Sequence, residues 1–200
     1  GGGGVPPASA AYLRRARELA DERGALLAFD EIQCGVGRTG RFLASEHAGV
    51  VPDLVTLAKG LAGGVPIGAL VMTDAVAAAM PAGGHGTTFG GNPLAAAAGL
   101  AVLEEIEARD LMAHAERMGR RFREGIAALG SPRVREVRGL GLMLGVELKE
   151  KAAPIIAALR EEGLLLINAG ANVIRFVPPL VIAEDEVDEA IAAFGRVLLR

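Results

Sequence analysis

The 200-residue sequence predicts an α/β fold in two parts, a domain in which short apolar strands alternate with helices and a small C-terminal α+β domain. The first part is indicated by a helical pattern that leads directly into the apolar run "ALLAFDE", and by two further short strands beyond a glycine-rich stretch. The second part is indicated by a change to alternating strand patterns with two helices. We therefore expect domains at residues 1–110 and 111–200.

Each element of the first part has a local signal. "PPASAAYLRRARELADERG" predicts a helix with Ser9 as its N-cap and Gly24 as its end. The run 25–31 is typical of a buried parallel strand, because it is short and apolar and becomes acidic only at its end. Further elements are expected along the chain: strands at 53–60 and 67–74, and helical patterns at 75–80 and 92–130. The last pattern is long, and the domain boundary is expected to lie inside it.

The second part begins with "RVREVRGLGLMLGVELK", whose alternation fits either a strand pair or one long bent strand. The remaining elements are a helix, two short strands and a capped terminal helix, expected at 153–163, 164–170, 173–180 and 183–200. This mixture predicts an α+β domain.

Composition excludes several classes of protein. The net charge is -3, and the chain lacks long basic runs and tryptophan, so nucleic acid is not expected as a partner. The sequence has neither the ~18 uninterrupted apolar residues of a membrane span nor the pattern of a signal peptide, and a cytoplasmic location is expected. Cys34 is the only cysteine and the three histidines are far apart, so neither an intrachain disulfide nor a metal site is expected.

Lys59 is the only charged residue of the apolar stretch 54–71, in a chain with three lysines and eighteen arginines. Desolvation would favour its neutral amine, which is the nucleophile that forms a Schiff base with an aldehyde. Glycines after it would let the backbone approach a flat ligand closely. The alternative is a lysine whose ammonium group extends from a strand end to solvent.

Asp30 and Glu31 follow an apolar strand, and ligands of open α/β sheets bind outside the carboxyl ends of the strands. The alternative is that these carboxylates cap the next helix. Gln33 could present its amide to the same cavity, but alone it is a weak signal.

Thr87 and Thr88 lie between glycines just before a helical pattern, a context suited to binding a phosphate group. An ordinary threonine-containing turn is an equal alternative. Arg175 interrupts the apolar run "VIRFVPPL", where its guanidinium would need a partner: either a substrate carboxylate or an acidic residue of the terminal helix.

The order of these motifs resembles one family. "LLAFDEIQCGVGRTGRFLASEHAGVVPDLVTLAKGLAGGVPIGALV" followed by "GGHGTTFGGNPLAAAAG" is similar to the class-III, or ω, aminotransferases, which use pyridoxal 5'-phosphate (PLP). The resemblance covers essentially the whole chain and implies PLP fold-type I. It is strongest to acetylornithine aminotransferases and to the enzymes that form carrier-protein-linked lysine, with a lean toward the latter.

The resemblance assigns a role to each candidate. Lys59 matches the catalytic lysine that holds the cofactor covalently and moves the proton. Asp30 matches the carboxylate at the pyridine nitrogen, and Gln33 the residue beside the phenolic oxygen. Thr88 matches the hydroxyl that binds cofactor phosphate across a dimer interface, and Thr87 a neighbouring substrate contact. A further position, Arg175, matches the arginine that holds the substrate α-carboxylate.

The implied reaction exchanges the terminal amine of N-acetylornithine or carrier-protein-linked lysine with 2-oxoglutarate or glutamate, in arginine or lysine biosynthesis, by a homodimer with shared active sites. Alternatives are a different ω-amine substrate, an aminomutase, or an inactive truncated module that only oligomerises. Gly2 replaces a glutamate usual in the family. The match begins about halfway into the family pattern, so we expect a C-terminal half with weak or no cofactor binding of its own.

Overall fold

The computed structural model describes residues 3–200 and divides them into two compact units. The N-terminal unit comprises Ala8–Gly37 and Arg41–Asp110. The C-terminal unit comprises Leu111–Arg200 together with residues 3–7 and Arg38–Gly40. Across the described residues, no helix combines the length and the apolar character needed to cross a membrane.

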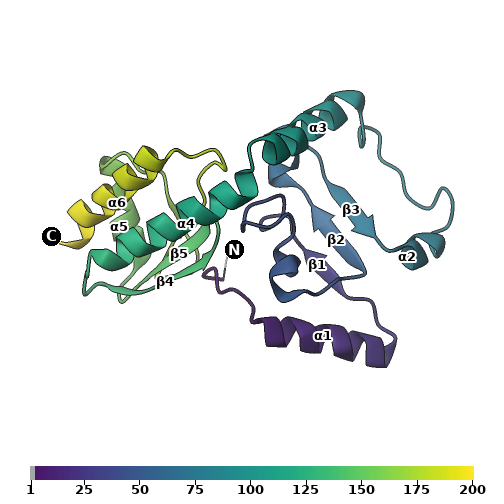
Figure 1. The fold of residues 1–200 in the computed structure, drawn as a ribbon, viewed down its shortest axis with the longest axis horizontal. Coiled ribbons are helices and arrows are strands. Elements are labelled where there is room, and N and C mark those ends of the chain that lie inside the picture. The colour runs from purple at the N-terminus through teal and green to yellow at the C-terminus, as the bar shows by residue number, and fades with distance from the viewer. Residues whose placement is uncertain (1–2) are drawn as a thin grey trace. The chain divides into compact units, whose positions relative to one another are not determined.

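A three-stranded sheet forms the centre of the N-terminal unit, in the order β1-β2-β3 (Figure 1). β1 is parallel to β2, whereas β3 is antiparallel to it. The strands and helices of this unit are α1 (Ala10–Arg23), β1 (Ala28–Asp30), η1 (Ala44–Ala48), β2 (Leu54–Leu57), η2 (Lys59–Ala62), β3 (Ala69–Met72), α2 (Asp74–Ala78) and α3 (Pro93–Ala108), where η1 and η2 are 3₁₀-helices. The parallel pair places the carboxyl ends of β1 and β2 at one edge of the sheet.

The helix expected after the N-terminal glycines is confirmed. The Ser9 side chain accepts a hydrogen bond from the Tyr12 backbone N–H at 3.2 Å, as an N-cap does. Gly24 ends the helix in the left-handed conformation, with φ of 60°.

The expectation of a buried strand at 25–31 was wrong in two respects. The strand is only three residues long, and Ala28 and Asp30 are exposed while Phe29 is half-buried. A buried parallel strand needs cover on both faces of its sheet. The described residues do not provide that cover for β1.

The C-terminal unit is an antiparallel sheet of four strands, in the order β4-β5-β7-β6. Its elements are α4 (Leu111–Ala128), β4 (Val134–Leu140), β5 (Met143–Leu148), α5 (Ala152–Glu161), β6 (Ile167–Asn168), β7 (Val173–Phe176) and α6 (Glu184–Leu198). The segment 133–149 is therefore a strand pair rather than one bent strand, joined by a tight turn between Leu140 and Met143.

One face of this sheet is packed against α4, α5 and α6 (Figure 1). Alternate residues of β5, Leu144, Val146 and Leu148, are fully buried in the core between them. The ring of Phe122 on α4 stacks on that of Phe176, with centroids 3.9 Å apart, and meets Phe194 of α6 edge-on at 5.6 Å. The opposite face carries the polar residues Arg138, Glu147 and Arg175 and the glycine Gly145, together with the buried Val173.

The expected single helix over 92–130 is two helices. It breaks at Arg109 and Asp110, where Asp110 takes the left-handed conformation with φ of 48°. α3 belongs to the N-terminal unit and α4 to the C-terminal unit. Aspartate visits this conformation more readily than most residues, so the break needs no glycine.

Candidate active site

Asp30 and Lys59 follow the ends of neighbouring parallel strands. Asp30 is the last residue of β1 and lies opposite Thr56 of β2, and Lys59 comes three residues after Thr56. Both residues are therefore at the carboxyl edge of the sheet, where ligands of α/β proteins bind. Both are exposed in this chain.

The carboxylate of Asp30 is oriented by its own turn. Its Oδ1 accepts hydrogen bonds from the backbone N–H of Ile32 at 3.0 Å and from the hydroxyl of Thr56 at 3.5 Å. The first bond stabilises the turn that follows β1, and the second ties the carboxylate to β2. These bonds restrict where the carboxylate can lie.

Lys59 has an unusual backbone conformation. Its φ is 48°, in the left-handed region that residues other than glycine seldom adopt. Such a conformation costs about 1–3 kcal/mol and persists only where the surroundings impose it. The last two residues of η2, Leu61 and Ala62, are buried, and η2 packs against α3, so the segment that Lys59 begins is held in place.

Lys59 is exposed among the described residues, so they do not supply the desolvation that was expected from the apolar sequence around it. The two glycines after η2, Gly63 and Gly64, both have positive φ, a conformation that glycine adopts more readily than other residues.

Glu31 and Gln33 lie in the turn between β1 and η1. Gln33 is half-buried. Glu31 is buried, with 3% of its surface exposed, and its carboxylate accepts hydrogen bonds from the backbone N–H groups of Ala44 and Ser45 at the start of η1. The capping alternative is therefore confirmed for Glu31.

Thr87 and Thr88 lie in an exposed loop between α2 and α3 (Figure 1). The Thr87 hydroxyl accepts a hydrogen bond from the Gly90 N–H at 3.3 Å, inside the same loop. Asn92 ends the loop by capping α3, since its Oδ1 accepts from the Ala95 N–H at 3.0 Å. The contacts described for Thr87 thus stay within its loop, which shows a threonine-containing turn and leaves the phosphate role a hypothesis.

Arg175 belongs to the C-terminal unit, in the middle of β7. Gly145 of β5 and Arg138 of β4 lie in register beside it on the same face of the sheet. Arg175 is half-buried. The polar row that it forms with Arg138 is a feature that sequence reasoning missed.

The segment 3–5 crosses this polar row at Gly145. Arg138 Nε donates to the carbonyl of Gly4 at 2.9 Å, and its guanidinium also pairs with Glu136 and Glu147. A Cβ at Gly145 would lie 3.3 Å from the Gly4 oxygen, closer than most real contacts. A glycine inside a strand pattern often marks such a close approach of backbone, so Gly145 was the available signal. Gly2, which the sequence comparison singled out, lies outside the described residues.

The sequence Gly-Arg-Thr-Gly at residues 37–40 has a structural role. Arg38 donates to the carbonyls of Leu142 at 3.4 Å and Pro178 at 2.5 Å, and its own carbonyl accepts from the Leu142 N–H at 3.0 Å. Burial lowers the pKa of the Arg38 guanidinium to about 10. The motif therefore holds the turn between β4 and β5.

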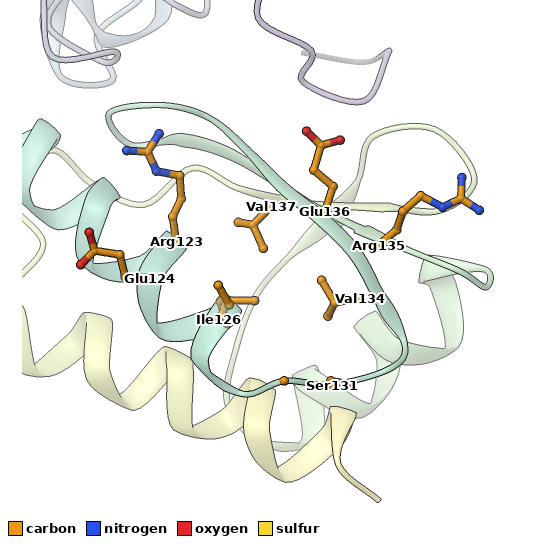
Figure 2. A pocket seen from close by; sticks show the side chains of 10 residues that line it. Arg123, Glu124, Ile126, Ser131, Val134, Arg135, Glu136 and Val137 are labelled. Carbon is orange, nitrogen blue, oxygen red and sulfur yellow. The ribbon is translucent and has the colours of Figure 1, made fainter.

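A pocket of about 460 Å³ lies elsewhere in the C-terminal unit, between the end of α4 and strand β4 (Figure 2). Ile126, Val134 and Val137 point into it. Several of its polar side chains have partners within the unit: Arg123 donates to the Gly139 carbonyl, and Arg135 pairs with Glu147. The sequence-predicted site residues do not line this pocket.

Comparison with known proteins identifies relatives of the whole chain. Residues 1–198 match the family described as aminotransferase class-III. The chain is 53% identical over 199 residues to the [LysW]-aminoadipate semialdehyde transaminase of Deinococcus radiodurans, covering 99% of the chain and 46% of the relative. It is 49% identical to the acetylornithine aminotransferase of Mycobacterium tuberculosis, covering 98% of the chain and 49% of the relative.

Solved structures agree with these matches. The N-acetylornithine aminotransferase of Stenotrophomonas maltophilia superposes with a TM-score of 0.90 at 41% identity, covering 100% of this chain and 54% of that one. An ornithine aminotransferase from Toxoplasma gondii, described with partial occupancy of PLP at its active site, gives 0.89 at 38% identity, covering 94% and 46%. The expected fold class is confirmed. The chain spans about half the length of the curated relatives it matches.

Proposed function

Because the chain belongs to the class-III aminotransferase family, we propose that the whole protein transfers a terminal amino group between an ω-amino substrate and 2-oxoglutarate or glutamate. The family is PLP-dependent, and we propose PLP as the cofactor. The activity is proposed for the whole protein, since these residues match about half the length of the relatives.

The observation that carries this proposal is the placement of a carboxylate and an amine at the carboxyl ends of the neighbouring parallel strands β1 and β2. When bound, PLP supplies an aldehyde that an amine can hold covalently and a pyridine ring that draws electrons from the substrate carbon. Asp30 and Lys59 fit this group, because an exposed carboxylate can accept the hydrogen of a ring N–H while an exposed amine can reach an aldehyde.

Each residue then has a distinct task. Asp30 would keep a proton on the ring nitrogen by offering it a negative charge. Lys59 would hold the cofactor through its amine, and the free amine would carry a proton to and from the substrate carbon. Its positive φ fixes the start of its side chain and so restricts where the amine can point. Gln33 would present its amide beside the cofactor's phenolic oxygen.

The remaining candidates bind charged groups. Thr88 contributes a hydroxyl to the cofactor phosphate, Thr87 a contact to substrate, and Arg175 a guanidinium to the substrate α-carboxylate. We assign Thr87 and Thr88 to the active site of a partner subunit, because their loop is exposed and Thr87 bonds within it.

A homodimer with shared sites is consistent with the surface of the N-terminal unit. Large apolar side chains of this unit are exposed on β3, on the threonine loop and on α3: Leu70, Val71, Phe89, Leu94 and Leu100. Cover by another chain or domain would account for this exposed apolar surface.

For the substrate we propose carrier-protein-linked lysine first and N-acetylornithine second. The relative named for the carrier-linked reaction is 53% identical, and those named for acetylornithine that we compared are 46–49% identical. Either reaction would belong to amino-acid biosynthesis, and we propose a cytoplasmic location on that basis.

The test uses the full-length protein reconstituted with PLP. Bound cofactor is expected to colour the protein yellow, and the colour is expected to bleach on addition of glutamate and of the correct ω-amine. Lys59→Ala should abolish turnover, whereas Lys149→Ala, which changes an exposed lysine of the other unit, should not. Wild-type turnover by Lys59→Ala would refute the assignment.

The amine panel separates the alternatives. Carrier-linked lysine, free lysine, N-acetylornithine and ornithine are each assayed with 2-oxoglutarate, and the ratio of kcat/KM values identifies the substrate. Migration of the amine within one substrate, without consumption of 2-oxoglutarate, would instead indicate an aminomutase.

A further inference from the structure

Glu31 is a buried carboxylate between two candidate cofactor ligands. It follows Asp30 directly and precedes Gln33 by two residues, yet only 3% of its surface is exposed. Glutamate is seldom buried to this extent unless its oxygens have hydrogen-bond donors. The hydrogen-bond donors around Glu31 therefore indicate which segments of the chain its carboxylate holds together.

The donors come from the next helix along the chain. Glu31 Oε2 accepts from the Ala44 N–H at 2.7 Å, and Oε1 accepts from the Ser45 N–H at 2.8 Å. The thiol of Cys34 donates to Oε2 at 3.6 Å. One carboxylate thus joins the turn after β1 to the first two residues of η1, thirteen and fourteen positions further on.

The backbone of Glu31 is fixed as well. Its N–H donates to the Thr56 carbonyl on β2 at 3.0 Å, and its carbonyl accepts from the Gly35 N–H at 2.9 Å. A Cβ at Gly35 would lie 2.9 Å from that carbonyl, so the turn closes tightly on Glu31. Asp30 comes directly before Glu31, and Gln33 comes two residues after it. Both side chains therefore project from a turn that Glu31 bonds to β2 and to η1.

We propose that Glu31 is a positioning residue for the cofactor site: its bonds to η1 hold the turn from which Asp30 and Gln33 reach the pyridine nitrogen and the phenolic oxygen of PLP. This inference rests on the proposed function. Glu31 itself does not touch the cofactor. Its replacement should displace both ligands together, and a displacement of about 1 Å in a catalytic group can cost about a hundredfold in rate.

The experiment compares three variants of the full-length protein. Glu31→Gln keeps the shape but places an NH₂ group against a backbone N–H donor. Ala44→Pro removes one donor and leaves Glu31 unchanged; proline is well suited to the first position of a helix, and Leu43 before it is already extended with ψ of 139°. Glu46→Gln is the matched control, because Glu46 accepts from the Leu43 N–H at the same end of η1 but is exposed.

Three readouts separate positioning from folding. Glu31→Gln is expected to lower kcat by at least tenfold while the KM for glutamate changes less than threefold, because the displaced groups serve the cofactor rather than the substrate. It should also shift the pH midpoint of the bound cofactor's visible absorbance and weaken PLP affinity. Ala44→Pro should act in the same direction to a smaller extent, and Glu46→Gln should leave all three readouts at wild-type values.

The outcomes are distinct. If wild type turns over and Glu31→Gln matches Glu46→Gln in kcat and in the absorbance midpoint, the positioning role is refuted while the proposed function stands. If Glu31→Gln does not fold, judged by circular dichroism, Ala44→Pro decides, and a wild-type midpoint in that variant overturns the proposal. If wild type binds no PLP and transfers no amine, the proposed function fails, and the positioning role fails with it.

Discussion

Gly119 and Gly125 lie on the same helix, α4, and replacing each by alanine tests whether the C-terminal unit is packed as described. Both changes remove an interior helical glycine, which should stabilise the helix by about 1 kcal/mol. Their neighbours differ. The new Cβ at position 119 would lie 1.9 Å from the Gly141 carbonyl oxygen, whereas at position 125 it would meet the end of the Ile191 side chain at 2.4 Å.

The Gly141 carbonyl has little room to move. Gly141 has φ of 49°, and on its other side the backbone of Thr39 lies only 2.5 Å from where a Cβ would be. Moving the carbonyl away would strain this contact and the bond between the Leu142 N–H and the Arg38 carbonyl, worth about 1 kcal/mol. With about 1–3 kcal/mol for overpacking, Gly119→Ala is expected to destabilise the protein by about 2 kcal/mol after the helix gain is subtracted.

Gly125→Ala should be nearly neutral. Ile191 is half-buried, and pushing its side chain off its rotamer costs about 0.5–1.5 kcal/mol, which offsets the helix gain. Thermal unfolding followed by circular dichroism measures both variants. For a unit of this size, 2 kcal/mol corresponds to a fall of roughly 8–15 °C in the midpoint of its transition. A Gly119→Ala protein at least as stable as wild type would refute the packing of α4 against the β4–β5 turn.

Three further results are expected. Burial, aided by the charge of Glu31, raises the pKa of the Cys34 thiol to about 11, so iodoacetamide should alkylate this single cysteine at pH 8 roughly a hundredfold more slowly than a free thiol; comparable rates would contradict it. The hydrogen bond from Arg138 lowers the pKa of Glu147, so this pair stabilises the fold above the unfolded pKa and the contribution is lost as pH falls through the folded value. Glu147→Gln should therefore flatten the acid side of the stability profile measured by urea unfolding, and an unchanged profile would count against the pair. Because Asp30 and Lys59 are exposed here, the 200-residue chain alone is expected to bind PLP weakly, and tight stoichiometric binding in an absorbance titration would overturn that expectation.

Elements with local signals were predictable from the sequence. The cap at Ser9 and the stop at Gly24 act within one or two turns of their own helix, and α1 begins and ends beside them. The terminal helix is similar, because the Glu186 carboxylate accepts from the Ala183 N–H three residues before it. Such bonds depend only on neighbours in sequence, so the pattern contains all the information needed.

The break at Asp110 could not be predicted from local capping signals. The helical pattern continues through Arg109 and Asp110, and Pro93 and Gly130 are its only strong boundary signals. α3 and α4 separate because their apolar faces pack in different units: α3 against η2, and α4 against α6 and β4. Tertiary packing overrode a local preference, and periodicity does not report which core a face will join.

The two adjacent carboxylates, Asp30 and Glu31, show what the sequence could and could not decide about the site. Both side chains fit a ligand role or a capping role by type, and successive residues at the end of a strand point to opposite sides. The deciding fact is the position of η1: its N–H groups lie where Glu31 points, so Glu31 is buried as a cap while Asp30 stays at the exposed edge beside Lys59. That contact joins residues thirteen apart through an irregular loop, which no local pattern specifies. A family resemblance could identify Asp30 as a candidate. Only the fold shows that the adjacent Glu31 is bonded to η1 and so holds the turn from which Asp30 projects.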